Sequence, residues 1–405
     1  MKKNKIYLGD NLEVLKTFPD SSIDSIVTDP PYGINFMNKK WDYDIPSIEL
    51  WKECLRVLKP GGHMLVACGT RTQHRMAYNI EEAGFVIRDI IAWLYGSGFP
   101  KSHDIGKGIE SKLLNGKSNS RNLRKTEQDG DGESYQLKGR NNGIMGEDRT
   151  YDRKKFKPST NQAKQYEGWG TALKPAMEMF TLVRKPLIGT VADNVLKYGT
   201  GGINIDGCRV EFNGDIPTAS GLGRKKENHT SYSIPSLEDK WVENKNGRFP
   251  ANLIHDGSEE VVNLFPNIGE ESPARFFYTP KASQSERNEG LYEFDKKYTA
   301  SAEFRPNHME KATEGQSGNP YGRWQPKKNI HPTVKPIELM RYLVRLITPK
   351  GGLCLDPYVG SGTTAIACKQ EKKEYIGIEI DEEYHSIAEA RIKAAVVEYN
   401  MFDYL

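Results

Sequence analysis

The first hundred residues alternate between short apolar runs and segments whose apolar side chains recur on one helical face, a pattern that predicts alternating strands and helices. The predicted strands are residues 6–8, 23–28, 63–68 and 86–93, and the predicted helices are residues 48–58 and 73–83. A turn at Lys59-Pro60-Gly61-Gly62 is predicted between the first helix and the strand that follows it. Strands separated by helices indicate a parallel sheet that is covered on both faces.

The last 75 residues return to the same pattern after a long middle region. The predicted helices are residues 337–347, residues 363–369 and a segment from 383 onward, and the predicted strands are residues 353–355 and 375–380. This strand-helix-strand unit lacks the rest of a sheet, and the missing strands can come only from the N-terminal hundred residues. We therefore expect both ends of the chain to fold into one α/β domain around the middle region.

The middle region is less regular. We interpret residues 101–165 as a polar, basic insertion that is a loop or disordered, because their hydrophobic periodicity vanishes. A strand is predicted at 177–183, within a segment 166–187 that belongs to the α/β domain. Residues 188–328 are rich in Gly, Asn and Pro and are interpreted as a separate, irregular region. Its brief strand-like pieces are residues 203–205 and 275–278.

Composition narrows the class of protein. Of the 405 residues, 37% are apolar and 27% are charged. No run of about 18 apolar residues exists to span a bilayer, which argues against a membrane protein. The short basic start leads into a strand and not into a signal peptide, so we expect a cytoplasmic protein. The 5 cysteines form no Cys-x-x-Cys pair, which fits a reducing compartment and predicts no structural zinc.

A glycine-rich segment, Gly360-Ser361-Gly362-Thr363-Thr364-Ala365, lies between a predicted strand and a predicted helix, and Glu379 follows 19 residues after Gly360. This is the spacing of a dinucleotide fingerprint, in which glycines admit the ligand, a helix N-terminus faces a negative group and a carboxylate holds a ribose. The match alone is weak, because tight turns without a ligand also produce it and because it does not separate nicotinamide from other adenosine cofactors. A phosphate-binding P-loop is excluded, since Thr363 stands where that motif needs Lys.

Asp29-Pro30-Pro31-Tyr32, at the end of a predicted strand, is more specific. Two prolines fix φ, so the Asp29 carboxylate and the Pro30 carbonyl are expected to face one point as fixed acceptors, with the Tyr32 ring beside them. Such an arrangement suits a planar ring that carries an exocyclic NH2 group. An ordinary strand-ending turn with a capping Asp is the alternative interpretation.

Three motifs together resemble the S-adenosylmethionine-dependent DNA amino-methyltransferases: Asp29 to Tyr32, His331-Pro332-Thr333-Val334-Lys335-Pro336, and Asp356-Pro357-Tyr358-Val359 with the following loop Gly360 to Thr364. Their order, with the catalytic motif first and the cofactor loop last, resembles the circularly permuted β group of this family. The resemblance implies an α/β, Rossmann-like methyltransferase fold with a mixed, mostly parallel sheet and helices on both faces, plus an irregular target-recognition region at 188–328. The catalytic domain would then consist of residues 1–100, 166–187 and 329–405.

The resemblance also implies roles for individual residues. The amides of the loop from Gly360 to Thr364 should receive the methionine carboxylate, Asp356 its amino group and Glu379 the ribose hydroxyls. The catalytic residues implied are Asp29, Pro30, Pro31 and Tyr32. The cofactor-binding residues implied are Asp10 and Asn11 near the adenine, Thr333 and Lys335 over the methionine end, and Asp356, Tyr358, Gly360, Ser361, Gly362, Thr363, Thr364, Glu379 and Ile380. The family usually has Phe at the position of Tyr358. Glu379 as a helix-capping acid and Lys335 as a solvated charge remain alternatives.

The reaction follows from the amine. Hydrogen bonds from an exocyclic NH2 group to Asp29 and the Pro30 carbonyl would favour a more electron-rich nitrogen when it meets the sulfonium methyl, with no metal needed. The base must be flipped out of the duplex, and stacking on Tyr32 would offset part of that cost. The leading hypothesis is a site-specific adenine-N6 methyltransferase; cytosine N4 is the rival, although the family more often has Ser in place of Asp29 for cytosine. Remoter alternatives are an NAD-dependent oxidoreductase and a nucleic-acid-binding module with an inactive site.

The partner implied is double-stranded DNA, with no membrane; a restriction endonuclease partner and a homodimer are left open. The net charge of +3 neither demands nor excludes a nucleic acid, but residues 101–165 hold 15 Lys or Arg against 9 Asp or Glu. We expect this insertion to contact the DNA backbone and residues 188–328 to recognise the target. The basic residues of that region are Arg209, Arg224, Lys225, Lys226, Arg248, Arg275, Arg287, Arg305 and Arg323.

Overall fold

The computed structural model of the chain describes residues 1–34, 42–96, 98, 102–116, 134–138, 150–154, 157–210, 247–265, 277–297 and 327–397. The chain divides into two compact units. The first consists of Met1–Gly96, Met177–Asp295 and Lys328–Leu405, and the second of Ser97–Ala176 and Lys296–Lys327.

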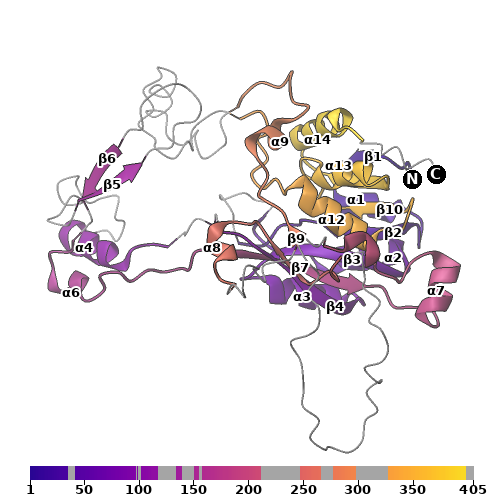
Figure 1. Ribbon diagram of the computed structural model, residues 1–405, viewed down its shortest axis with the longest axis horizontal. Coiled ribbons are helices and arrows are strands. Elements are labelled where there is room, and N and C mark those ends of the chain that lie inside the picture. The colour runs from indigo at the N-terminus through magenta and orange to yellow at the C-terminus, as the bar shows by residue number, and fades with distance from the viewer. Residues whose placement is uncertain are drawn as a thin grey trace, which may run out of the picture. The chain divides into compact units, whose positions relative to one another are not determined.

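Among the described residues, the first unit is built on a nine-stranded sheet in the order β1-β11-β10-β2-β3-β7-β4-β8-β9 (Figure 1). The strands are β1 (Lys5–Leu8), β2 (Ile23–Thr28), β3 (Leu58–Gly69), β4 (Val86–Leu94), β7 (Met177–Arg184), β8 (Leu253–His255), β9 (Phe277–Tyr278), β10 (Leu353–Asp356) and β11 (Glu374–Glu379). Only β7 runs antiparallel to its neighbours, β3 and β4. The predicted mixed, mostly parallel sheet is confirmed.

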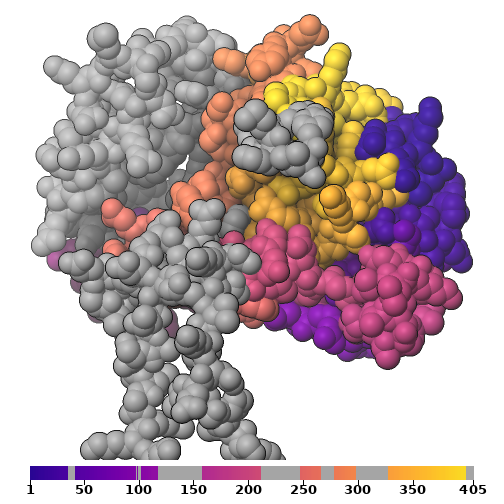
Figure 2. Space-filling view, turned by 45° about the vertical axis from the view of Figure 1, so that its right-hand side comes forward, coloured from indigo at the N-terminus to yellow at the C-terminus, as the bar shows by residue number. Residues whose placement is uncertain are grey.

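The two ends of the chain interleave within this sheet. The strands β10 and β11, from the last part of the sequence, lie between β1 and β2, and all three of these pairings are parallel. Figure 2 shows the same arrangement at the surface, where atoms of the C-terminal part lie directly against those of the N-terminal part. The prediction that both ends build one domain is therefore confirmed.

Helices cover both faces of the sheet, as predicted. The alternation along β3 shows why: Met64, Val66 and Cys68 belong to one buried cluster, and Leu65 and Ala67 belong to the other. The helices that contribute to the first cluster are α1 (Asn11–Lys16), α2 (Ile48–Val57) and α3 (Gln73–Glu82). The second cluster contains residues of α12 (Ile337–Ile347) and α13 (Thr363–Gln370), and α14 (Glu382–Ala394) packs next to α13. None of the described helices is long and apolar enough to cross a membrane.

One predicted turn lies inside a strand. Residues 59–62 belong to β3, whose pairing with β2 shifts register between Ile23 and Ser25, so that the extra residues bulge out of the ladder. The bulge is held from outside the sheet, because the side chains of Asn194 and Thr200 both donate hydrogen bonds to the Pro60 carbonyl. The sequence Lys-Pro-Gly-Gly by itself predicts a turn, because the hydrogen bonds from Asn194 and Thr200 cannot be predicted from local sequence.

The predicted irregular region from 188 onward is not wholly separate from the sheet. Its strands β8 and β9 extend the sheet beyond β4, and α7 (Val191–Tyr198) packs near β3. No strand forms at 203–205, which precedes the 3-10 helix η4 (Asp206–Cys208); the predicted strand at 275–278 is present as β9 in its described part. The strand β8, with three residues, is too short to leave a periodic signal in the sequence.

The second unit, considered by itself, contains regular structure that the sequence did not predict. Its described elements are α4 (Ile105–Asn115), α6 (Asn161–Lys164) and the antiparallel strands β5 (Ser134–Lys138) and β6 (Thr150–Lys154). Buried Glu110 accepts hydrogen bonds from the amides and hydroxyls of both Ser159 and Thr160, which fixes α4 to the start of α6. The expectation of a loop or disordered segment is wrong for these parts. The helix α4 left no signal in the sequence because a buried polar contact, and not an apolar stripe, holds it.

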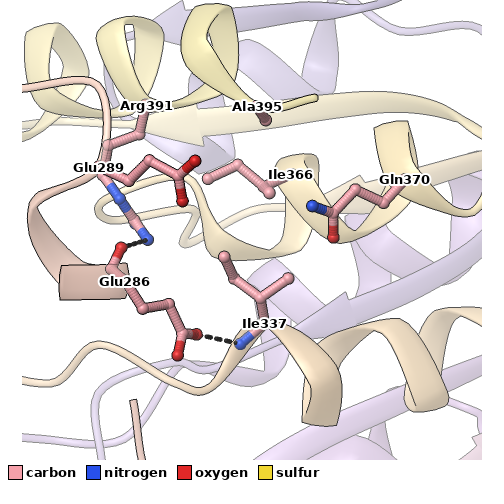
Figure 3. A pocket seen from close by; sticks show the side chains of 7 residues that line it. All are labelled: Glu286, Glu289, Ile337, Ile366, Gln370, Arg391 and Ala395. Atoms are coloured by element: carbon pink, nitrogen blue, oxygen red, sulfur yellow. Dashed lines mark hydrogen bonds between the residues drawn. The ribbon is translucent and has the colours of Figure 1, made fainter. Parts of the chain in front are cut away.

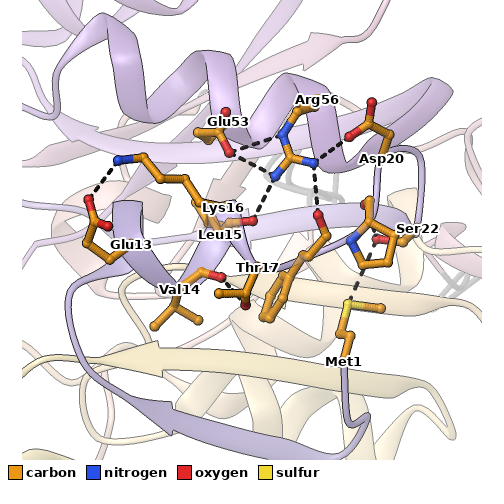
Figure 4. Close-up of polar contacts among 12 residues, drawn as sticks. Met1, Glu13, Val14, Leu15, Lys16, Thr17, Asp20, Ser22, Glu53 and Arg56 are labelled. Atoms are coloured by element: carbon orange, nitrogen blue, oxygen red, sulfur yellow. Dashed lines mark hydrogen bonds and ion pairs between the residues drawn. The ribbon is translucent and has the colours of Figure 1, made fainter.

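Arg56, on α2, ties this helix to the segment between α1 and β2 (Figure 4). Its guanidinium donates to the carbonyl oxygens of Leu15 and Phe18, at 2.8 Å in each case. It also binds the carboxylates of Glu53, at 2.8 Å, and Asp20, at 2.5 Å. One side chain therefore fixes how α1 and α2 pack together on their face of the sheet.

Replacing Arg56 with Ala should lower the free energy of unfolding by about 2 kcal/mol, because two backbone carbonyl oxygens lose a charged donor. Lys16→Ala is the matched control: Lys16 pairs with Glu13 at 2.7 Å, but the two side chains are 52% and 68% exposed. Such an exposed pair contributes little to stability, because water screens it. Urea unfolding followed by circular dichroism measures both variants, and equal losses would contradict the role given to Arg56.

Candidate functional site

Four acidic residues lie at the ends of neighbouring strands. Asp10 follows β1, Glu379 ends β11, Asp356 ends β10 and Asp29 follows β2. These four strands are adjacent and mutually parallel, so their carboxyl ends meet at one edge of the sheet. Ligands of open α/β sheets bind outside this edge.

A pocket opens there between the Asp29 corner and the glycine-rich loop. Its lining residues are Asp29, His331, Thr333, Lys335, Met340, Asp356, Tyr358, Val359, Gly360, Ser361, Thr363 and Thr364. A buried hydrogen bond of 2.7 Å from Thr28 Oγ1 to Asp356 Oδ1 joins the two strands that carry these motifs. The structure thus brings together segments that are more than 300 positions apart in the sequence.

The glycine-rich loop already uses two of its own amides. The Gly360 N–H donates to Glu379 Oε2 at 2.9 Å, and the Gly362 N–H donates to the Val359 carbonyl at 2.9 Å. The amides of Ser361, Thr363 and Thr364, at the start of α13, donate to no other described residue. All the amides from Gly360 to Thr364 were expected to bind an anion, but only these three of them are available for it.

Gly360 has no room for a side chain. Its φ is +53°, and a Cβ atom would lie 2.7 Å from Nε2 of His331. The loop is therefore pressed against the His331-Pro332-Thr333 segment. Burial is the first cause that lowers the pKa of His331 to about 3, so its ring is neutral at physiological pH.

Asp356 is buried and accepts three hydrogen bonds. Thr28 Oγ1 and the Tyr358 amide donate to Oδ1, and Thr364 Oγ1 donates to Oδ2 at 2.5 Å. Burial raises the pKa of Asp356 to about 6 in spite of these donors. A carboxylate offers about four lone-pair sites, so one remains for an ammonium group in the pocket.

Glu379 sits at the tip of β11 and is 8% exposed. Its carboxylate accepts hydrogen bonds from the amides of Gly360, Ile380 and Asp381, while burial raises its pKa to about 7. The cap of α14 is Asp381, so the alternative that Glu379 caps this helix is wrong. Neither Glu379 nor the exposed Ile380 lines the pocket described above.

The predicted residues at the end of β1 lie beside the pocket. Asp10 caps α1 by accepting from the amides of Leu12 and Glu13. Asn11 donates to the Pro357 carbonyl at 3.1 Å, which links this corner to the strand end that carries Asp356. Tyr358 lines the pocket, and burial raises the pKa of its hydroxyl.

The Asp29 carboxylate is held from both sides. Tyr32 Oη donates to Oδ1 at 2.8 Å, and Lys335 Nζ binds Oδ2 at 2.5 Å. The same lysine lies 3.3 Å from Glu178 Oε2. The Pro30 carbonyl accepts no hydrogen bond from any described residue. Asp42 accepts from the amides of Tyr32 and Gly33 and so fixes the corner in addition to its prolines.

The alternative that Lys335 is a solvated charge is therefore wrong. Lys335 lines the pocket together with the glycine-rich loop, but its ammonium is bound to Asp29 and Glu178. Its side chain is 10% exposed, and although burial lowers its pKa, the attraction of Asp29 and Glu178 raises it above the usual value. Glu178 was missed by the sequence analysis. It is the second residue of β7, and because β7 runs antiparallel, the start of this strand lies beside the carboxyl ends of β3 and β4. A motif search that looks only at strand ends does not find it.

The residues expected to recognise a target are only partly described. Arg209 binds Asp206 at 2.7 Å, and Arg287 donates to the His331 carbonyl at 2.9 Å, so Arg287 holds the wall of the pocket. Arg248 pairs with Val210 through the backbone. Arg224, Lys225, Lys226, Arg275, Arg305 and Arg323 lie outside the described residues. Among the described residues no cluster of His, Cys, Asp or Glu could hold a metal ion, and all five cysteines are buried with free thiols.

Comparison with known proteins places these motifs in a family. A family described as DNA methylase, of the N6/N4 type, matches residues 23–390. The type II methyltransferase M2.DpnII of Streptococcus pneumoniae is 42% identical over 64 residues, which are 16% of this chain and 24% of that protein. The type II methyltransferase M.BglII of Bacillus subtilis is 35% identical over 108 residues, or 24% of this chain and 30% of that protein. The matched stretches thus span less than a third of either relative.

A solved structure, described as PvuII DNA methyltransferase (cytosine-N4-specific), matches with 15% identity and a TM-score of 0.44. The match covers 96% of this chain and 86% of that one. A likeness at this level does not decide which base this chain modifies.

Lys335→Met should destabilise the protein by about 3 kcal/mol at pH 7.5, because it leaves the Asp29 and Glu178 carboxylates together without their cation. The raised pKa of Lys335 means that its stabilisation is complete below the unfolded value of 10.5 and is lost as pH rises through the folded value. Urea unfolding at pH 7.5, followed by circular dichroism, measures this loss.

The double variant Lys335→Met/Glu178→Gln is the control, since it removes one of the two orphaned charges. It should recover part of the stability at pH 7.5. A loss that Glu178→Gln does not relieve would show that the charges are not the cause.

Proposed function

The chain belongs to the N6/N4 family of S-adenosylmethionine-dependent DNA methylases, and we propose that it transfers a methyl group to the exocyclic N6 amine of adenine at a specific site in double-stranded DNA. The observation that carries this proposal is that Asp29 lines the same pocket as Ser361, Thr363 and Thr364, whose amides are open. An oxidoreductase would need the loop but leaves the paired acceptors of Asp29 and Pro30 without a role.

The donors and acceptors around the pocket fit S-adenosylmethionine. The open amides of Ser361, Thr363 and Thr364 suit its carboxylate, and Asp356 keeps a lone-pair site for its amino group. Glu379, Ile380, Asp10 and Asn11 are proposed to face its adenosine end, at the tips of β11 and β1. When bound, this molecule supplies a methyl group that is electrophilic because it is attached to a positively charged sulfur. Thr333 and Tyr358, which line the pocket, would enclose it.

The acceptors at Asp29 serve the amine. The lone pair of an exocyclic amine is delocalised into the base, which makes the nitrogen a weak nucleophile. Donating its two N–H groups to Asp29 and the Pro30 carbonyl favours a tetrahedral nitrogen and stabilises the positive charge that develops on it. The nitrogen lone pair forms the bond to the methyl carbon, the pair of the carbon-sulfur bond stays on sulfur, and one N–H proton then leaves to Asp29 or to water.

The ammonium of Lys335 competes with the target amine in this arrangement. Both are N–H donors, and the lysine binds Asp29 Oδ2 at 2.5 Å. Glu178, 3.3 Å from the same Nζ, offers a second carboxylate, so the lysine can stay paired when the amine binds Asp29. The Tyr32 hydroxyl donates to the other carboxylate oxygen of Asp29, Oδ1. The partly buried ring of Tyr32 is the proposed stacking surface for the flipped base.

Asp29 favours adenine over cytosine. The family more often has Ser at this position when the target is cytosine N4, which is the second candidate because the same acceptors would serve it. We propose that residues 188–328 recognise the target sequence and that the basic insertion 101–165 contacts the DNA backbone. A restriction endonuclease partner would follow from a type II system and is not required by this site.

The target base can be identified directly. The purified chain, given S-adenosylmethionine with a labelled methyl group and unmodified genomic DNA, should produce N6-methyladenine within one sequence context. Digestion to nucleosides with mass spectrometry, followed by sequencing of the modified sites, measures this. N4-methylcytosine as the product would replace the proposed base with the second candidate, and the absence of any labelled nucleoside would refute methyl transfer to DNA.

Asp29→Ala should abolish methyl transfer, with a loss of at least about 100-fold in kcat, because the amine loses a charged acceptor in the transition state. Binding of S-adenosylhomocysteine, measured by calorimetry, should change little, since Asp29 is not proposed to hold the cofactor. Asp10→Ala is the converse control: Asp10 is proposed to face the adenosine, so this variant should weaken binding of S-adenosylhomocysteine. Full activity in Asp29→Ala would refute the proposed role.

A further inference from the structure

A buried arginine lies behind the glycine-rich loop. Arg391, on α14, is 1% exposed, and its Nη1 donates to the Ser361 carbonyl at 2.6 Å, to Ser361 Oγ at 3.0 Å and to Thr363 Oγ1 at 3.3 Å. These are two of the three residues whose amides are open to the pocket. Arg391 therefore touches the loop on the side away from the expected ligand.

The guanidinium has no carboxylate partner among the described residues. Its Nη2 donates to the Glu286 carbonyl at 3.4 Å, and its buried Nε has no hydrogen-bond partner there. Figure 3 shows Arg391 pointing from α14 toward Glu286, whose own carboxylate accepts from the Ile337 amide at 2.6 Å. The carboxylates of Glu286 and Glu289 attract the guanidinium, but neither forms an ion pair with it. Buried charges in proteins are normally paired by direct contact, so this one calls for an explanation.

The charge remains present at neutral pH. Burial is the first cause that lowers the pKa of Arg391, to about 10, which still leaves the group protonated. The nearby N-terminus of α13 also carries partial positive charge. Both act in the same direction, and both would be compensated by one anion on the open side of the loop.

We propose that Arg391 is a positioning residue for the amino-acid end of S-adenosylmethionine. It holds the backbone of Ser361 and the side chain of Thr363, so that the amides of Ser361, Thr363 and Thr364 converge, and its positive charge attracts the carboxylate that they bind. The inference rests on the proposed function, because it needs this ligand in the pocket. It assigns to α14 a part in binding that none of the three sequence motifs contains.

The test compares two ligands that differ at the amino-acid end. S-adenosylhomocysteine carries the carboxylate and amino group, whereas 5′-methylthioadenosine keeps the adenosine and sulfur but lacks both. In Arg391→Met, affinity for S-adenosylhomocysteine should fall by about 30-fold, the loss expected when a charged hydrogen-bonding group is removed. Affinity for 5′-methylthioadenosine should change by less than about twofold, since its contacts do not involve the loop amides. Calorimetry on the full chain measures both.

A matched control is available on the neighbouring helix. Lys369, on α13, donates to the Ile392 carbonyl of α14 at 3.0 Å, so it is a cation that joins the same two helices without contacting the loop. Lys369→Met should leave both affinities unchanged. Arg391→Lys keeps the charge but cannot reach all of the acceptors, and it should lose affinity for S-adenosylhomocysteine by a smaller factor than Arg391→Met.

The outcomes separate the inference from the proposed function. If the unaltered chain binds neither ligand, the proposed function and this inference fail together. If it binds both and the Arg391 variants lose them equally, Arg391 only supports the fold and the inference is wrong. Unchanged binding of S-adenosylhomocysteine in the variants also overturns it. Should Arg391→Met fail to fold, Arg391→Lys measured with the same two ligands decides, because only a selective loss of S-adenosylhomocysteine supports the inference.

Discussion

The parallel pairing of β10 with β2 is the constraint on which the site depends. It aligns Cys354 with Ser25 and Leu355 with Ile26, and the buried bond from Thr28 to Asp356 fixes the same register at the strand ends. Side chains alternate faces along a strand, so a slip of one residue would turn Asp356 away from its partners and Leu355 out of its core cluster. The hydrophobic pattern and the polar bond therefore favour one register together, and that register places the Asp29 corner beside the glycine-rich loop.

Much of this could be predicted from local sequence. The elements of the two chain ends were predictable because their strands and helices bury continuous or periodic apolar faces, and the site edge followed from where those strands end. The failures have a different cause. The bulge at 59–62, the helix α4 and the short strand β8 are held by contacts between distant residues, such as Asn194 on Pro60 or Glu110 on Ser159. Single-sequence patterns do not contain such contacts, and they did not indicate Glu178 or Arg391 either.

The carboxylates of Asp29, Asp356 and Glu379 already accept hydrogen bonds from the protein itself when no ligand is bound. Asp29 holds Tyr32 and Lys335, Asp356 holds both strand ends and α13, and Glu379 holds the loop to the tip of β11. Each carboxylate therefore has a structural role in addition to its proposed chemical one. Such bonding keeps the groups oriented at little reorganisation cost when a ligand binds. It also means that loss of binding in an Asp356 or Glu379 variant would not by itself identify a ligand contact, whereas the selective comparison of two ligands does.

The described end of the middle region forms part of the same site. Leu291, which is fully buried, packs against Tyr384 and Ile387 of α14, and the helix α9 (Gln284–Asn288) lies next to it in the chain. From α9, Arg287 donates to the His331 carbonyl, while the Glu286 carbonyl accepts from Arg391. One short helix thus contacts both the segment that carries Thr333 and Lys335 and the arginine behind the glycine-rich loop. The region proposed to recognise DNA therefore supports one wall of the pocket from behind, through the hydrogen bond from Arg287 to the His331 carbonyl. Its described end is packed into the same unit as the catalytic part.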